Sequence, residues 1–285
     1  MNTKQTAIVI GTGAGGAVAA KELQGRYQVT ILEAGKDFKP FSQSIPAWSG
    51  LHGTGMFFDE RLIRALIPNM LVEKTPDMVM VRGIGVGGTT TLATGNAVRY
   101  DGALRELGID LDREFDSLYA ELPITTEHRK NWTETTKRMF ALFEEMGLDP
   151  VVTPKLLRAP QCVGCGHCAI GCPTGAKWDT RELINEAIQK GAELITGCHV
   201  TELEISNSRV TGVHAKKAGR RVTYHADLVI LAARHPPGAT ASYAVYQSAG
   251  GLYHLALYGL SQLLFQQGLA YADGESCQYH DQARR

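Results

Sequence analysis

Two short apolar runs near the N-terminus, separated by a helical pattern, predict a βαβ unit. Residues 6–10 and 28–32 are continuous apolar runs of the kind found in buried strands of a parallel sheet. The residues between them place apolar side chains at helical spacing: Ala17, Val18, Ala20 and Leu23. Gly25 can then end the helix. We therefore expect a strand, a helix and a second parallel strand in this part of the chain.

A second set of patterns, after residue 178, predicts a helix followed by several strands. Asp179 is a candidate N-cap, and Gly191 stands where a C-terminal cap is expected. The apolar face of this helix consists of Leu183, Ile184, Ala187 and Ile188. Strands are expected at 193–196, 200–205, 210–215, 222–224 and 227–232. The middle three follow one another closely and predict an antiparallel β-meander, and the last predicts a return to a buried sheet.

The remaining segments have a mixed pattern, in which one helix is predicted from Thr133 to Met146, closed by Gly147. Taken together, the patterns predict the α/β class. The architecture we expect is a Rossmann-like domain with an antiparallel β-meander and partly helical insertions at about 36–79 and 101–178.

Composition and charge narrow the range of partners. The chain has 285 residues, 44% of them hydrophobic, which is enough to bury a core. Its 29 basic and 29 acidic residues cancel, so no overall charge draws it to nucleic acid or to an anionic membrane surface. The most apolar stretch, 251–270, is interrupted by polar residues, and no membrane span is expected. Residues 1–6 lack the pattern of a secretory signal, which favours a cytoplasmic location.

The glycines after the first strand follow the G-x-G-x-x-G fingerprint of dinucleotide-binding turns. Gly11 allows the tight turn, Gly13 allows a pyrophosphate to approach the backbone, and Gly16 allows close packing of helix and strand. Glu33 ends the second strand 20 residues after Gly13, where its carboxylate can accept ribose hydroxyls. The alternative is a glycine-rich turn that binds nothing. The dinucleotide-contacting residues predicted here are Gly11, Gly13, Ala14, Gly15, Gly16, Glu33 and Ala34.

A second loop rich in glycine and threonine, residues 82–91, follows about 70 residues later. Gly95, Asn96 and Ala97 come shortly after it. FAD is longer than a nicotinamide dinucleotide and is commonly held at two such points, so the second loop favours FAD over NAD.

With these motifs the sequence resembles the glucose-methanol-choline (GMC) family of flavoproteins over approximately residues 6–233. The likeness rests on IVIGTGAGG at 8–16 with LEAG at 32–35, on VGGTTT at 86–91, and on the segment from GCHV at 197–200 to ADLVILAA at 226–233. It implies an FAD-dependent oxidoreductase that oxidises an alcohol-type substrate by hydride transfer to flavin N5, with a histidine as base.

The resemblance also implies roles for individual residues. Glu33 would bind the adenosine ribose and Val200 the adenine. The pyrophosphate and flavin would be contacted by Gly87, Gly88, Thr89 and Thr90. The family commonly has asparagine at the position of Ala93, a role that Asn96 could take over.

Four of the six cysteines lie in one short segment with the spacing C-x2-C-x2-C-x3-C-P. This is the spacing of a bacterial ferredoxin half-site and predicts an iron–sulfur cluster on Cys162, Cys165, Cys168 and Cys172, with the distant Cys198 as an alternative fourth ligand. Zinc, with His167 or Cys172 completing the set, is a second alternative, and reduced structural thiols are a third.

The resemblance weakens after Ala233, and the histidine segment of the family has no clear counterpart. His235 is a weak candidate base beside two prolines. We expect an FAD-binding domain at 1–234 and an atypical tail at 235–285, with one helix at 252–265, in a truncated or altered relative of the family. The alternatives to an alcohol-oxidising flavoenzyme are an iron–sulfur flavoprotein subunit that passes electrons to an acceptor protein, and a non-catalytic FAD-binding remnant.

Overall fold

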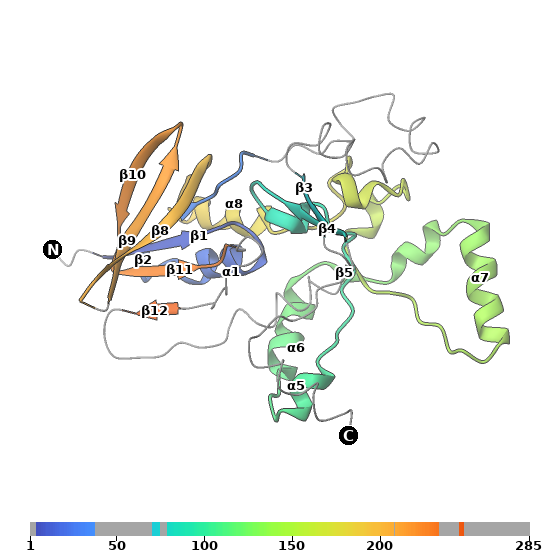
Figure 1. Ribbon diagram of the computed structural model, residues 1–285. Coiled ribbons are helices and arrows are strands. Elements are labelled where there is room, and N and C mark those ends of the chain that lie inside the picture. The colour runs from blue at the N-terminus through green and yellow to red at the C-terminus, as the bar shows by residue number, and fades with distance from the viewer. Residues whose placement is uncertain (1–3, 38–69, 75–78, 208, 234–244, 248–285) are drawn as a thin grey trace, which may run out of the picture.

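The computed structural model describes residues 4–37, 70–74, 79–207, 209–233 and 245–247. Its largest sheet has five strands and lies at one side of the molecule, next to the meander (Figure 1). In spatial order the strands are β12 (Val245–Gln247), β11 (Leu228–Leu231), β1 (Gln5–Ile10), β2 (Tyr27–Leu32) and β7 (Glu193–Ile195). All neighbours are parallel except β12, which runs antiparallel to β11. The apolar runs of β1 and β2 pair along their whole length, which confirms the predicted βαβ unit.

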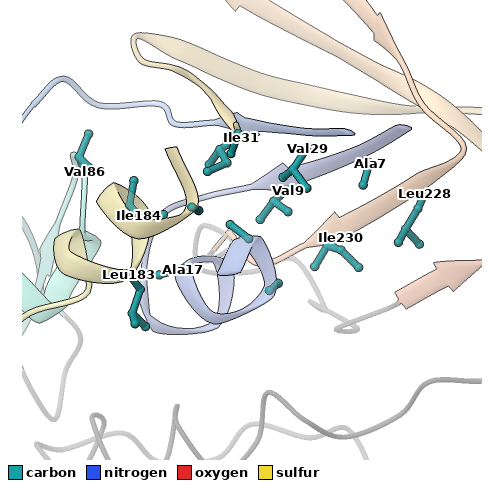
Figure 2. Close-up of a cluster of buried hydrophobic side chains, with 14 of the residues drawn as sticks. Ala7, Val9, Ala17, Val29, Ile31, Val86, Leu183, Ile184, Leu228 and Ile230 are labelled. Carbon is teal, nitrogen blue, oxygen red and sulfur yellow. The ribbon is translucent and has the colours of Figure 1, made fainter. Parts of the chain in front are cut away.

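Two helices cover one face of this sheet. They are α1 (Ala14–Glu22) and α8 (Arg181–Gln189), which pack against each other as well as against the strands. Figure 2 shows Val9, Ile31 and Ile184 in the buried layer between the sheet and the helices. Because successive side chains of a strand point to opposite faces, Ile8 and Ile10 lie on the other side.

A three-stranded antiparallel meander covers that other side. Its strands are β8 (Cys198–Ser206), β9 (Arg209–Lys217) and β10 (Arg220–His225), in the order β10-β9-β8. Val213 and Ala215 of β9 are fully buried in a core shared with Ile8 and Val229 of the central sheet. The meander predicted from the short strands is therefore confirmed, and the domain has three layers.

The described residues between β2 and α8 form smaller elements. They are β3 (Met70–Lys74), β4 (Val79–Gly83), the 3-10 helix η3 (Gly88–Thr91), α5 (Gly102–Glu106), α6 (Asp112–Glu121), β5 (Ile124–Thr125), η4 (Glu127–Asn131), α7 (Glu134–Glu145), β6 (Lys155–Leu156), η5 (Ala159–Gln161) and η6 (His167–Ile170). The helix α7, capped by Thr133, is confirmed. The β3–β4 hairpin and the short helices α5 and α6 were not predicted.

One predicted helix cap differs from the structure by one residue, and two other predictions lie outside the described residues. The predicted cap Asp179 lies one residue before the true N-cap Thr180, although its carboxylate still accepts the N–H of Arg181 at 3.1 Å. The helix predicted at 252–265 and the candidate base His235 lie outside the described residues. Within the described ranges, no helix is both long and apolar enough to cross a membrane.

Candidate functional site

The turn between β1 and α1 is built so tightly that two of its positions require glycine. A Cβ at Gly16 would lie 2.0 Å from the carbonyl oxygen of Gly11, and Gly11 itself has a φ of +94°. Gly13 differs, because a Cβ there would meet nothing within 4 Å. Helix α1 starts at Ala14, and its first turn contains no acidic residue. Its N-cap residue is Gly13, so no side chain at that position accepts a hydrogen bond from the helix. The N-terminus of a helix with such a start favours a negatively charged group.

Thr12 and Glu33 stabilise this turn through buried hydrogen bonds. The Glu33 carboxylate accepts the Thr12 N–H at 3.0 Å, the Thr12 hydroxyl at 2.6 Å and the Gly35 N–H at 2.8 Å. Both side chains are buried, Thr12 completely and Glu33 with 6% of its surface exposed. A carboxylate has about four lone-pair sites, so three protein donors leave room for one more hydrogen bond. The hydrogen bonds of Glu33 therefore mainly stabilise the turn, and its carboxylate can accept only one further hydrogen bond from a ligand.

The second glycine loop docks directly on this turn. Gly87 donates its N–H to the Thr12 hydroxyl at 3.0 Å, and a Cβ at Gly88 would lie 3.0 Å from the Cα of Gly13. Gly87 and Gly88 both have positive φ, +92° and +54°, so the contact depends on glycine at both positions. The two glycine-rich segments, about 70 residues apart in sequence, therefore form one junction.

Buried threonines connect this junction to the start of α8. The hydroxyls of Thr90 and Thr180 are 2.9 Å apart, and Thr180 also donates its N–H to the Thr90 hydroxyl at 3.2 Å. Thr90 donates its hydroxyl to the Gly87 carbonyl at 2.6 Å, and the Thr180 hydroxyl lies 3.3 Å from the carbonyl of Thr12. Three segments of the chain thus meet through buried hydroxyl groups.

Lys177 adds a buried cation beside the same loop. Its ammonium donates to the carbonyls of Thr91 and Ala93, each at 2.7 Å, and lies 3.1 Å from those of Thr90 and Cys168. Only 5% of the residue is exposed. Burial lowers the pKa of Lys177 to about 8, and the nearby carboxylate of Asp179 opposes that effect.

The backbone after β2 is joined to the start of the meander. Glu33 donates its N–H to Ile195 and accepts the N–H of Cys198, both at 2.9 Å, and Gly197 donates to Gly35 at 2.9 Å. Val200 lies two residues further along β8, where it pairs with Ala215 next to a bulge. The residues predicted to contact ribose and adenine are thus on adjacent backbone segments.

A profile described as GMC oxidoreductase matches residues 5–250. The chain belongs to the GMC oxidoreductase family. Two uncharacterised GMC-type oxidoreductases of Mycobacterium tuberculosis are 27% identical to it over 267 residues, which is 87% of this chain and 39% of each relative. A long-chain-alcohol oxidase of Arabidopsis thaliana is 26% identical over 240 residues, which is 76% of this chain and 30% of the relative. The chain thus spans about two fifths or less of the length of these relatives.

Solved structures agree on the fold. Pyridoxine 4-oxidase from Mesorbium loti matches with a TM-score of 0.55 and 14% identity, over 80% of this chain and 49% of that chain. A formate oxidase variant from Aspergillus oryzae RIB40 matches with a TM-score of 0.51 and 15% identity, over 80% and 45%. At these identities the likeness concerns the fold alone, and it confirms the predicted α/β class with its parallel sheet and antiparallel meander.

In this member of the GMC family, Lys155 holds Asn96 in place. Its side-chain oxygen accepts a hydrogen bond from the Lys155 ammonium at 2.7 Å, and its backbone forms a bridge with the same residue. The structure therefore holds Asn96 on the strand-like segment that follows the second loop. The suggestion that it replaces a family asparagine stays a prediction.

The described residues do not support the predicted ferredoxin-like centre. All four cysteines are described, and no three His, Cys, Asp or Glu side chains in the described part of the chain are grouped so that they could hold a metal ion. Cys165 is exposed, whereas Cys198 is buried in the core beneath the meander. The Cys172 sulfur accepts the Lys177 N–H at 3.4 Å. The spacing fits iron–sulfur or zinc ligands, but no three of the described side chains form a group that could hold a metal.

The thiols instead differ in their surroundings. Burial raises the pKa of the Cys168 thiol. Burial also disfavours the thiolate of Cys172, but hydrogen bonds from the backbone of Lys177 and from Thr174 outweigh it and lower the pKa of that thiol. In the structure all four cysteines of the segment are free thiols.

Sequence reasoning missed three residues at the junction: Thr12, Lys177 and Thr180. Thr12 occupies a variable position of the glycine fingerprint. Thr180 and Lys177 form hydrogen bonds with residues about 85 to 170 positions away in the sequence. Of these three residues, only Lys177 follows closely on a motif found in the sequence, the cysteine segment that ends at Cys172 and Pro173.

Proposed function

We propose that this chain is the FAD-binding part of an oxidoreductase that oxidises a CH–OH group. Membership of the GMC family supports an enzyme of this class. The observation that carries the proposal is the junction itself, where the fingerprint turn, Glu33 and the second glycine loop meet at the end of β1 and β2. The carboxyl ends of parallel strands are where α/β domains bind dinucleotides.

The residues present fit a dinucleotide. Gly13 faces open space in which a pyrophosphate could approach the backbone, at the start of α1. Glu33 retains one acceptor site for a ribose hydroxyl, and Val200 lies on the adjoining strand for the adenine. Gly87 and Gly88 bring the second loop to the same turn, where it would hold the flavin side. Bound FAD would supply the hydride acceptor of the reaction.

The protein's own contribution at this junction is binding and orientation. The braced turn fixes the amides of Ala14, Gly15 and Gly16 relative to the second loop, because Thr12 contacts both Glu33 and Gly87. Thr89 and Thr90 hold the second loop in shape: Thr89 accepts the N–H of Gly83 at 3.2 Å through its hydroxyl. His235 lies outside the described residues, and we derive no catalytic role for it.

We infer an alcohol-type substrate, with an electron acceptor as the second partner. Long-chain-alcohol oxidases of Arabidopsis thaliana are among the relatives, so primary alcohols of different chain length are the substrates to test first. Because the chain covers only about 30% of those relatives, activity of the whole protein is part of the proposal.

The first experiment measures FAD binding to the full chain, with NAD as comparator. We compare the wild type with Gly13→Ala and with the matched control Gly102→Ala, which also adds a Cβ in open space. Alanine can adopt the backbone of Gly13, with φ −63° and ψ −173°, so stability should change by no more than about 1 kcal/mol. The added methyl group should weaken FAD binding by about tenfold or more.

Gly102→Ala should bind FAD as the wild type does. A chain that binds no FAD, or a Gly13→Ala variant with unchanged affinity, would contradict the proposal. A second measurement follows reduction of an artificial electron acceptor with a panel of alcohols. Binding without turnover would favour the alternative of a non-catalytic FAD-binding remnant.

A further inference from the structure

We propose that Lys177 is a positioning residue of this site: its ammonium fixes the backbone of the second glycine loop and so sets how that loop holds the cofactor. The inference rests on the proposed function, because it assigns the grip on FAD to a residue outside both glycine motifs. No sequence motif of the dinucleotide turn includes Lys177.

The contacts of Lys177 are concentrated on one short stretch of backbone. Its ammonium has three N–H donors and four carbonyl oxygens within 3.1 Å, three of which belong to Thr90, Thr91 and Ala93. These carbonyls lie at the end of η3 (Gly88–Thr91), just after the glycines that touch the dinucleotide turn. A cation at the carbonyl end of a helical turn is favourable, because the unpaired oxygens there carry partial negative charge.

The burial of Lys177 makes this cation costly to remove. With 5% of the residue exposed, water has little access to the carbonyls that the ammonium satisfies. A side chain of similar length without a charge would leave several buried oxygens without donors. The loop would then have to open toward solvent, and Gly87 and Gly88 would lose their fixed place against Gly13.

The fourth carbonyl, that of Cys168, extends the role of the lysine. The Cys168 carbonyl oxygen lies 3.1 Å from the Lys177 ammonium, so the same ammonium contacts both the cysteine segment and the second loop. Lys177 also donates its own N–H to the sulfur of Cys172 at 3.4 Å. Through Lys177 the cysteine segment is therefore held against the second loop.

The test compares the full chain with Lys177→Met, Lys177→Arg and Lys190→Met. The last is a matched control: Lys190 lies at the far end of α8 and pairs with Glu186 at 2.6 Å on the exposed surface. Hydrogen exchange is measured without flavin on peptides covering 88–96 and on peptides from β1 and β11. The affinity for FAD, the visible absorption spectrum and the midpoint potential of the bound flavin are then measured.

For Lys177→Met we expect at least tenfold faster exchange in 88–96, with β1 and β11 unchanged. FAD affinity should fall at least tenfold, and the flavin spectrum and potential should shift. Lys177→Arg, which keeps the charge, should recover part of each effect, and Lys190→Met should match the wild type. If Lys177→Met does not fold, Lys177→Gln, which keeps two N–H donors, serves in its place.

Two results would overturn the inference. One is unchanged exchange in 88–96. The other is faster exchange throughout the sheet, which would make Lys177 a general stabilising residue. If exchange changes as expected but the spectrum, potential and affinity of bound flavin do not, the role in holding the cofactor is also wrong. A wild-type chain that binds no FAD would contradict the proposed function, while the exchange measurement would still decide whether Lys177 fixes the loop.

Discussion

Helices α8 and α7 are both amphipathic, but only α8 buries its apolar face. Leu183, Ile184 and Ala187 of α8 are buried against α1 and the central sheet. None of the residues of α7 is buried, and its apolar stripe is exposed at Met139, Leu142, Phe143 and Met146. In Figure 1, α7 lies at the opposite side of the molecule from the sheet and the meander. The two helices show that an apolar stripe alone does not determine how strongly a helix is packed.

The segment around α5 and α6 depends on a different kind of contact. Its small core consists of Leu111 and Phe115, and the Arg99 guanidinium lies 4.3 Å from the centre of the Phe115 ring. Arg99 also pairs with Asp101 and Asp112, and its hydrogen bond holds the pKa of Asp101 below its usual range. Surface ion pairs of this type contribute little to stability. The layered domain, in contrast, is held together by two large apolar cores.

The largest change in the free energy of unfolding should come from a cavity in the layered domain, which consists of the helices α1 and α8, the five-stranded sheet and the meander. Ile184→Ala removes a fully buried side chain between α8 and the sheet, so unfolding should become easier by about 3 kcal/mol. Urea unfolding followed by circular dichroism measures this change. A loss below about 1 kcal/mol would mean that α8 is not an essential layer of the core.

The layered domain is also the part that could be predicted from sequence. Its strands are short apolar runs with clear ends, and its glycine turn has a fingerprint whose members are neighbours in the chain. α7 could be found as well, because Thr133 and Gly147 mark its ends. Local signals were sufficient for each of these elements.

Other elements depend on contacts that local sequence does not encode. The hairpin of β3 and β4 is defined by the pairing of Val72 with Val81, within a segment of mixed pattern. The role of Lys177 depends on carbonyls 84 to 87 residues away in the chain. The cysteine spacing predicted a metal centre, but spacing alone does not determine where the thiols point, and no three of the described side chains form a metal-binding group. The glycine motifs could therefore be found in the sequence, whereas the supporting side chains could not, and the cofactor contacts of those glycines stay a prediction.

A smaller effect should come from the hydrogen bonds that join the starts of β1 and β11. The Asp227 carboxylate accepts the N–H of Thr6 at 2.8 Å and its hydroxyl at 2.9 Å. The backbone hydrogen bond and then the side-chain one lower the pKa of Asp227. A lowered pKa means that the stabilisation is present above the unfolded pKa and is lost as pH falls through the folded one.

Asp227→Asn should therefore reduce the free energy of unfolding by about 1 kcal/mol at pH 7. Below roughly pH 4 the difference between variant and wild type should shrink, because the carboxyl of the wild type becomes protonated. Thermal unfolding at a series of pH values measures both. A difference that stays constant down to pH 2 would show that the charge of Asp227 has no part in joining the strands.

The smallest change in the free energy of unfolding is expected for a substitution in α7. This substitution tests the comparison of α7 with α8 most directly. Leu142 has 51% of its surface exposed, and glutamine has a helix propensity close to that of leucine. Leu142→Gln should therefore change the free energy of unfolding by no more than about 0.5 kcal/mol, in contrast to Ile184→Ala. The same urea experiment measures both variants. A loss above about 1 kcal/mol would mean that Leu142 is buried in solution, and the contrast between the two helices would then be wrong.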